Sequence, residues 1–234
     1  MARSQDHPSV GGLSPQEAFL ERGVITGQFA ELYCYCVVRC MMEWGLMQPG
    51  HEVVVGWDPR ESGGTLAGRA VVGVSKAGGK PLVAGVVPTP AVPLLMLHRR
   101  ARLGLVITAS HNPADQNGIK IFLPQTAMKP LPVEDDFISE TVLATDFGAL
   151  MQMDERSTAE DVSDKAASLL SEFCCRQSNS WLESPDEQRQ LTLIVDPANG
   201  AYTGIATEVF RRLGAGEVIQ INPSGEGPVN RGSG

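Results

Sequence analysis

Positive charge is scarce in this 234-residue sequence, in which 19 lysines and arginines stand against 27 aspartates and glutamates and give a formal net charge of -8 at pH 7. No cluster of lysine and arginine interrupts this acidic balance. Surfaces that bind nucleic acid carry such clusters, so we expect no nucleic-acid partner. An anionic small molecule would need the few cations of this chain to be gathered around it.

Long apolar runs are missing as well. The most apolar helical stretch, at residues 33–47, is interrupted by Arg39 and Glu43, whereas a membrane-spanning helix needs about 20 consecutive apolar residues. The first eight residues are polar and no apolar segment follows them, so no signal peptide is recognisable. We therefore expect a cytoplasmic protein with no membrane partner.

The five cysteines do not form a disulfide framework, because their number is odd and their spacing is irregular. Two of them lie two residues apart in a predicted helix and point to different faces, which argues against a zinc site. We interpret all of them as buried thiols in a reducing cytoplasm; they are Cys34, Cys36, Cys40, Cys174 and Cys175.

The stretch at residues 105–122 has the most informative pattern in the chain. It begins with the apolar run Leu-Val-Ile, which predicts a buried strand, and changes abruptly to Thr-Ala-Ser-His-Asn-Pro at residues 108–113. Asn-Pro and Asn-Gly are turn signals, and a strand-like alternation resumes at residue 119. We therefore expect Ser110, His111 and Lys120 to lie together at the end of a sheet, where open α/β sheets bind their ligands.

This stretch resembles the active-site signature of the α-D-phosphohexomutases, which interconvert hexose 1-phosphates and hexose 6-phosphates. The resemblance rests on Thr-Ala-Ser-His-Asn-Pro followed without a gap by Asn-Gly-Ile-Lys. In that family the serine carries a phosphoryl group, which implies that Ser110 is the phosphoryl donor. The resemblance further implies that Lys120 is the general base and that His111 hydrogen-bonds the reacting oxygens or the phosphate.

Two other segments resemble the same family. Arg-Gly-Val at residues 22–24 matches the end of a family loop whose arginine lies at the active site, so Arg22 would help to hold the anion; the residues just before it depart from the usual pattern. Gly-Trp-Asp-Pro-Arg-Glu-Ser at residues 56–62 resembles a second family segment. There we expect Asp58 and Arg60 to pair locally and shape the turn.

Each candidate residue also has a structural interpretation. Ser110 could be a turn hydroxyl, Lys120 an edge-strand lysine that deters aggregation, and His111 and Arg22 solvated surface residues. Their occurrence together at the family's spacing favours the catalytic interpretation. A serine hydrolase is disfavoured, because Ser110 lacks a Gly-x-Ser-x-Gly elbow and the adjacent His111 is poorly placed as its base.

Helices and strands alternate through much of the chain. The predicted order is helix 28–44, strand 53–55, helix 66–77, strand 82–86, helix 90–100, strands 105–107 and 119–122, and helix 133–143. This rhythm favours a three-layer α/β/α fold around a mostly parallel mixed sheet. A helix at 161–175, a strand at 191–196, a helix through 209–213 and a strand at 217–221 then predict an incomplete second α/β domain.

We divide the chain into four parts on this basis. Residues 1–17, which contain several prolines and glycines, should be loosely ordered. Residues 18–150 form the first domain with the serine loop, residues 151–190 a linker and helix, and residues 191–234 the incomplete second domain.

The resemblance also implies a magnesium ion and a hexose 1,6-bisphosphate intermediate. In the phosphohexomutases Mg²⁺ is held by the phosphoserine and by three aspartates of an Asp-Gly-Asp-x-Asp-Arg loop. No Asp-x-Asp-x-Asp pattern occurs in this sequence, so Ser110, through its phosphate, is the only metal ligand that we predict here.

Two function hypotheses follow. In the first, the chain is the N-terminal portion of a phosphohexomutase, an isomerase of carbohydrate metabolism that acts as an intramolecular phosphotransferase on a phosphorylated hexose, and is inactive as this fragment. In the second, it is a short, non-catalytic protein that keeps the fold as a binding or pairing module. The sequence does not show which hexose is preferred or what the oligomeric state is.

Overall fold

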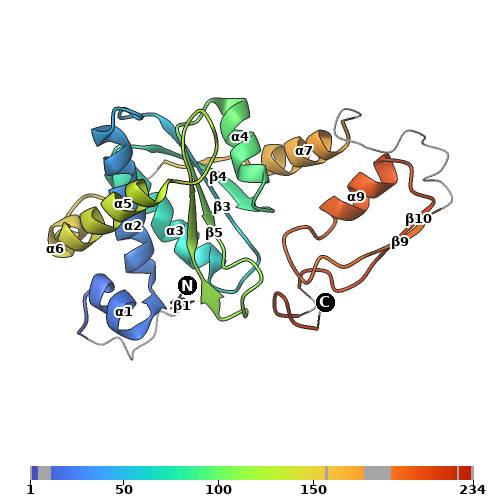
Figure 1. The fold of residues 1–234 in the computed structure, drawn as a ribbon, viewed down its shortest axis with the longest axis horizontal. Helices are drawn as coiled ribbons and strands as arrows, with labels where there is room; N and C mark the ends of the chain where they lie inside the picture. The colour runs from blue at the N-terminus through green and yellow to red at the C-terminus, as the bar shows by residue number, and fades with distance from the viewer. Residues whose placement is uncertain (1, 5–11, 156–157, 177–190, 226, 233–234) are drawn as a thin grey trace.

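The computed structural model describes residues 2–4, 12–155, 158–176, 191–225 and 227–232. Its larger sheet has five strands in the order β7-β5-β3-β4-β8 (Figure 1). Strands β3, β4, β5 and β8 are parallel, and β7 is antiparallel to β5. The bounds are Glu52–Trp57 for β3, Lys80–Val86 for β4, Leu103–Ile107 for β5, Ile119–Phe122 for β7 and Glu160–Asp161 for β8.

Helices cover both faces of this sheet. Helices α2 (Gly27–Glu43) and α3 (Gly63–Lys76) lie on one face, and α4 (Ala91–Arg99) and α7 (Ser163–Cys174) lie on the other (Figure 1). Successive side chains of a strand point to opposite faces, and β3 shows the result: Val53 and Val55 enter the core beneath α2 and α3, whereas Val54 enters the core beneath α4 and α7. The predicted three-layer α/β/α fold with a mostly parallel mixed sheet is confirmed.

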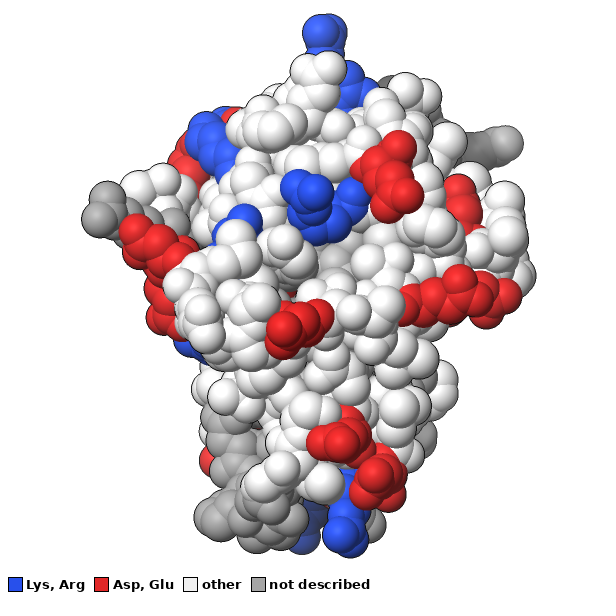
Figure 2. All heavy atoms as spheres, turned by 90° about the vertical axis from the view of Figure 1, so that its left-hand side faces the viewer, with Lys and Arg blue, Asp and Glu red and all other residues white. Residues whose placement is uncertain are grey.

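The remaining elements of this part flank the layers. Helices α5 (Pro132–Ala144) and α6 (Phe147–Met151) extend the side of α2, against which α5 packs. A small three-stranded sheet joins β2 (Val24–Ile25), β1 (Ala2–Ser4) and β6 (Gln116–Asn117) in that order. The face that includes α5 and α6 shows separated groups of Asp and Glu with isolated Lys and Arg between them (Figure 2).

Residues 1–17, predicted to be loosely ordered, contain one strand and the start of a helix. Ala2–Ser4 forms β1, and helix α1 (Pro15–Arg22) begins inside that range. Its start is fixed by a capping box in which Ser14 Oγ accepts a hydrogen bond from Glu17 N, and Glu17 in turn accepts one from Ser14 N at 2.7 Å. Residues 5–11 lie outside the described part.

The described part of residues 151–190, predicted as a linker and helix, lies against the first sheet. Strand β8 pairs with β4, and α7 packs on β4 and α4, so this segment completes the first sheet and its core. Ala166 and Leu170 are 0% and 2% exposed within that core. The apolar stripe of this helix predicts its presence but not its packing partner, because such a stripe does not specify which surface it covers.

The C-terminal part is a small α/β unit. Strands β9 (Thr192–Val195) and β10 (Glu217–Gln220) are parallel and are connected through helix α9 (Ile205–Arg212) (Figure 1). Ile194 and its register partner Ile219 are 68% and 42% exposed. One face of this two-stranded sheet is therefore open to solvent. Across the described residues, no helix is both long and apolar enough to cross a membrane.

Candidate active site

The loop between β5 and β7 lies at the carboxyl ends of the parallel strands, where ligands of open α/β sheets bind. Strand β5 is fully buried, and so is Ala109 just after it, but Ser110 and His111 are exposed. Thr108 N donates to the carbonyl of Gly118 at 2.9 Å and closes the loop on itself. The structure thus places Ser110 at the strand end that the sequence predicts.

Ser110 has an unusual backbone conformation. Its φ is +59°, in the left-handed region that costs a residue with a side chain about 1–2 kcal/mol. Such a conformation persists only where the surroundings determine it. Here Ser110 N donates to Thr108 Oγ1 at 3.0 Å, and Thr108 Oγ1 donates to Asp58 Oδ2 at 2.6 Å. The loop is therefore anchored to the end of β3.

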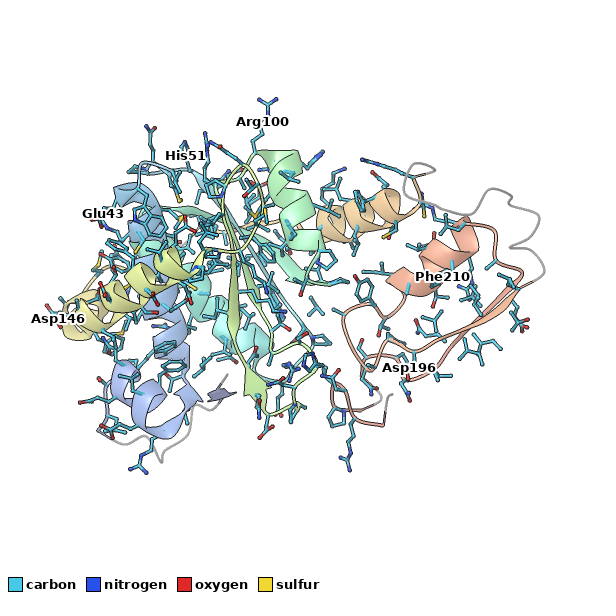
Figure 3. All side chains as sticks on the ribbon, in the orientation of Figure 1. Glu43, His51, Arg100, Asp146, Asp196 and Phe210 are labelled. Carbon is cyan, nitrogen blue, oxygen red and sulfur yellow. The ribbon has the colours of Figure 1, made fainter. Side chains whose placement is uncertain are left out.

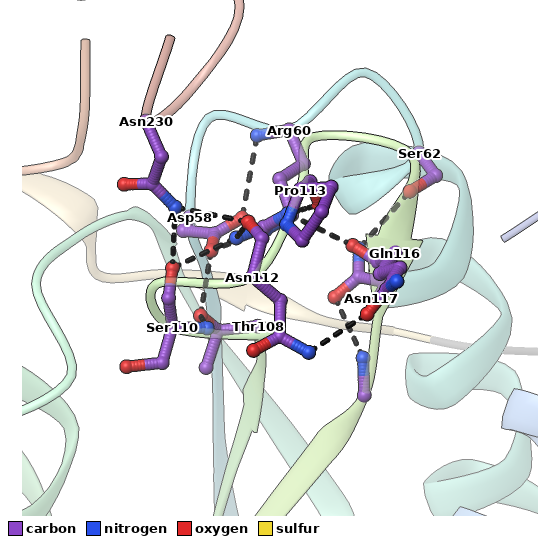
Figure 4. Close-up of polar contacts among 11 residues, drawn as sticks. Asp58, Arg60, Ser62, Thr108, Ser110, Asn112, Pro113, Gln116, Asn117 and Asn230 are labelled. Carbon is purple, nitrogen blue, oxygen red and sulfur yellow. Dashed lines mark hydrogen bonds and ion pairs between the residues drawn. The ribbon is translucent and has the colours of Figure 1, made fainter. Parts of the chain in front are cut away.

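Arg60 contributes most of the remaining anchors (Figure 4). It is 3% exposed. Its Nη atoms donate to four backbone carbonyls of the serine loop: Ser110 at 2.8 Å, Asn112 at 3.0 Å, Gln116 at 3.0 Å, and Pro113. Its Nε donates to Asp58 Oδ2 at 3.0 Å, which completes a buried ion pair. All of its polar atoms are engaged, so Arg60 fixes the loop and leaves the Ser110 side chain exposed.

The predicted local pairing of Asp58 and Arg60 is present, but the hydrogen bonds of Arg60 to the serine loop do not follow from the sequence pattern. A guanidinium has five N–H donors in a fixed fork, and one aspartate cannot satisfy them all when the group is buried. The sequence feature that could have indicated these contacts is an arginine three residues after the end of a buried strand. Its other acceptors lie 50–56 residues away in the sequence, beyond any local pattern.

Lys120 lies on β7, opposite Val106 of β5. It is half-buried and lines a cavity of about 410 Å³ together with Tyr33, Lys129 and Asp135. Burial lowers the pKa of Lys120 below its usual value, and the nearby Lys129 and Arg60 lower it further, while Asp58 opposes the shift. A lysine that loses its proton more readily is better suited to act as a general base.

The two other predicted site residues are less constrained. His111 is exposed on the loop, directly after Ser110. Arg22 is exposed in the last turn of α1, and among the described residues no hydrogen bond or ion pair joins it to Ser110. The strand that follows Arg22 is nevertheless tied to the loop, because β2 pairs with β1 and β1 pairs with β6.

The residues around Ser110 do not form a magnesium site by themselves. Within the described ranges, no group of three or more His, Cys, Asp or Glu side chains is placed to hold a metal ion. Asp58, the carboxylate connected to the loop, is occupied by Arg60 and Thr108. A phosphate on Ser110 would be one oxygen donor, and Mg²⁺ prefers six.

Comparison with known families assigns the part of the chain that carries this loop. The family model described as phosphoglucomutase/phosphomannomutase, alpha/beta/alpha domain I, matches residues 21–148, a range that contains every site residue discussed above. The chain belongs to this family. Residues 21–148 correspond to the α/β/α domain I of the phosphoglucomutase/phosphomannomutase family, and this domain contains the Ser110 loop.

Relatives of the chain support the assignment. It is 35% identical over 214 residues to a phosphoglucosamine mutase of Bordetella avium, a match that covers 90% of this chain and 46% of that protein. It is 37% identical over 185 residues to a phosphoglucosamine mutase of Saccharopolyspora erythraea, covering 77% of this chain and 38% of that protein. The chain thus spans less than half the length of these relatives.

Solved structures agree on the fold. A phosphoglucomutase/phosphomannomutase family protein from Burkholderia thailandensis superposes with a TM-score of 0.63 at 26% identity, covering 84% of this chain and 40% of that one. A putative phosphomannomutase from Thermus thermophilus gives a TM-score of 0.67 at 22% identity, covering 87% and 43%. The second comparison is evidence for the fold alone.

Proposed function

We propose that the complete gene product containing this chain interconverts hexose 1-phosphate and hexose 6-phosphate through a phosphoserine at Ser110. The observation that supports this most directly is Ser110 itself, which is exposed in a left-handed conformation at a strand end. Buried Arg60 holds its backbone, and the side chain stays accessible. A nucleophile or phosphoryl donor needs this combination of fixed position and free hydroxyl.

The proposed reaction has two transfers. In the first, the phosphoryl group leaves the Ser110 oxygen and bonds to a sugar hydroxyl. Neutral Lys120 accepts the hydroxyl proton and passes it to the Ser110 oxygen, so that the serine hydroxyl is restored. The product is a hexose 1,6-bisphosphate. After the sugar reorients, the phosphoryl group at its other end returns to Ser110, and the serine hydroxyl proton passes through Lys120 to the sugar oxygen that is released. Phosphoserine is regenerated, so atoms and charges balance over the cycle.

Cations must offset the charge of the phosphoserine, which is about -1.5 to -2 at neutral pH. We propose that exposed His111 hydrogen-bonds the phosphate or the reacting oxygens, and that Arg22 helps to hold the substrate anion. Mg²⁺ would stabilise charge on the transferred group, with the Ser110 phosphate as one ligand. Because the described residues supply no further ligand cluster, we expect the 234-residue chain alone to lack mutase activity.

We propose a phosphorylated hexosamine as the first substrate to test, because the relatives described above are named phosphoglucosamine mutases. Glucose and mannose phosphates are the alternatives. The non-catalytic hypothesis remains a second candidate, and the absence of a metal-ligand cluster from the described residues is the observation that favours it. In that case the fold would serve as a binding or pairing module.

The test uses the gene product as encoded, supplied with Mg²⁺ and a trace of glucose 1,6-bisphosphate. Conversion of glucosamine 6-phosphate, glucose 1-phosphate and mannose 1-phosphate is measured, and phosphopeptide mapping locates the phosphate. Ser110→Ala and Ser110→Gly should abolish both turnover and labelling, and glycine does so without backbone strain. Ser168→Ala, which removes an exposed hydroxyl on α7, is the matched control. Near-normal turnover in both Ser110 variants would contradict the proposal.

A further inference from the structure

The small C-terminal unit reaches the serine loop through one side chain. Asn230 Nδ2 donates to the carbonyl of Ser110 at 2.9 Å and to the carbonyl of Asn112 at 3.0 Å (Figure 4). These residues are 118–120 positions apart in the sequence. The same two carbonyls accept hydrogen bonds from Arg60 Nη2 at 2.8 and 3.0 Å. Each of these two carbonyl oxygens therefore accepts one hydrogen bond from Arg60 and one from Asn230.

This double anchoring uses the chemistry of each group fully. An amide nitrogen carries two hydrogens, so Asn230 can serve both carbonyls at once, and a carbonyl oxygen has two lone pairs for its two donors. Asn230 itself is half-buried; its hydrogen bond to Asn112 is partly shielded from water, whereas the one to Ser110 is exposed. The geometry leaves no unused donor on the amide nitrogen.

Asn230 is fixed within its own unit. Its backbone N donates to the carbonyl of Ala198 at 2.9 Å, next to the C-terminal end of β9. Buried Asn199 donates from Nδ2 to the carbonyl of Arg231 at 3.2 Å. The φ of Asn230 is +65°, which asparagine tolerates better than most residues. The amide is thus presented by a turn that hydrogen bonds tie to the loop after β9.

We propose that Asn230 is a positioning residue for Ser110, through which the C-terminal α/β unit sets the conformation of the proposed phosphoserine loop. When that unit is docked, its amide and Arg60 together hold the left-handed backbone of Ser110. When it moves away, only Arg60 and the Thr108 contact remain. The catalytic consequence rests on the proposed function; the contact itself does not.

The contact is tested by hydrogen exchange on this chain. Asn230→Asp replaces two donors by a carboxylate that only accepts and faces two carbonyls. The control is Asn222→Asp, because Asn222 also has a left-handed φ, of +45°, and lies in the same unit, but donates to Asp196 Oδ2 at 2.9 Å. Figure 3 labels Asp196, just after β9. The control therefore perturbs the unit without touching the loop.

Peptides covering residues 108–116 should exchange about tenfold faster in Asn230→Asp, because the loop loses both hydrogen bonds from Asn230. They should be unchanged in Asn222→Asp. Asn230→Ala removes the donors without adding charge. It is the second variant in case the aspartate unfolds the C-terminal unit. Faster exchange of peptides from β9 and β10 would reveal such unfolding. Unchanged exchange in both Asn230 variants overturns the proposal. Equal acceleration in Asn222→Asp, with the peptides from β9 and β10 exchanging as in the wild type, also overturns it.

The catalytic consequence is tested in the gene product as encoded. Asn230→Asp should lower kcat about tenfold, with KM nearly constant, because Asn230 acts on the loop and not on the sugar. A raised KM at unchanged kcat would contradict a positioning role. If Ser110→Gly keeps its turnover in the same assay, the proposed function fails, whereas the exchange experiment still decides whether Asn230 holds the loop.

Discussion

Arg60 Nη2 and the carbonyl oxygen of Ser110 are 2.8 Å apart, and the Arg60 side chain has no exposed surface. A buried cation thus binds the backbone of the proposed phosphoserine. This arrangement separates two tasks. The guanidinium determines where the loop lies, and the exposed side chains of Ser110 and His111 are left for the chemistry.

Replacing Arg60 by lysine should disorder the serine loop. Lysine keeps the charge but not the planar fork that serves four carbonyls and Asp58. The partly buried carbonyls of Pro113 and Gln116 would lose the donor that Arg60 supplies, at about 1–3 kcal/mol each. We expect the free energy of unfolding to fall by about 3 kcal/mol, and mutase turnover of the complete gene product to fall about 100-fold. Urea denaturation and the mutase assay measure the two effects.

The matched control for this change is Arg100→Lys. Arg100 is exposed at the C-terminal end of α4 (Figure 3), so the same substitution there removes no buried contact. Its free energy of unfolding should stay within about 0.5 kcal/mol of the wild type. An Arg60→Lys protein as stable as Arg100→Lys would show that the loop does not depend on the guanidinium.

Removing the charge of Lys129 should raise the pKa of Lys120 towards its usual value. The pKa of Lys120 is lowered first by burial and then by Lys129. In Lys129→Ala the titration of Lys120 should therefore move to higher pH, and any rate that needs the neutral amine should rise at higher pH than in the wild type. Methylated-lysine NMR of this chain measures the shift without requiring activity.

Lys129→Arg is the control, since it keeps a cation beside Lys120, and the titration should stay near that of the wild type.

The lowered pKa of Lys120 also has a consequence for stability. Because the folded pKa of Lys120 lies below the unfolded one, the unfolded chain binds more protons between the two values. Lys120 therefore lowers the free energy of unfolding by its full amount below the folded pKa. This loss shrinks as the pH rises from the folded pKa to the unfolded pKa, and it is absent above both values. A pKa of Lys120 equal in both Lys129 variants would show that charge is not the cause.

Truncating Leu170 on α7 should destabilise the first sheet. Leu170 is 2% exposed in the core shared with β4 and α4. Leu→Ala changes at such positions cost about 2–5 kcal/mol. Leu97→Ala, at a leucine that is 54% exposed on α4, is the control and should change stability little. Equal unfolding midpoints in urea would mean that α7 is a linker helix after all.

Lys76 should be needed for the packing of α2 against α3. It is 1% exposed and donates to Glu31 Oε1 at 2.7 Å, and Glu31 is fully buried. Arg69 also contacts Glu31 but is partly exposed. Lys76→Met should cost about 3–5 kcal/mol, because it leaves a buried carboxylate undercompensated. Lys80→Met removes exposed ion pairs instead and should matter little in the same thermal denaturation experiment.

Local patterns predicted the fold better than they predicted the site. Helix α2 and strand β5 follow from apolar spacing and from runs of apolar residues, which depend only on neighbouring residues. The partners of Arg60 and Asn230 lie 50–120 residues away and depend on how the finished elements meet. The packing of α7 on β4 and α4 depends on such long-range contacts in the same way. The roles of Ser110, His111, Lys120 and Arg22 stay predictions.

The left-handed backbone of Ser110 also restricts which residues can occupy this position. β-branched side chains are poorly tolerated at positive φ, so threonine, although it has a hydroxyl that could be phosphorylated, does not suit this loop. Asparagine, aspartate and glycine do suit it. A Ser110→Asp protein should keep the loop conformation and carry a permanent negative charge there. Loop geometry thus discriminates between two hydroxyl residues that are chemically equivalent as phosphate carriers.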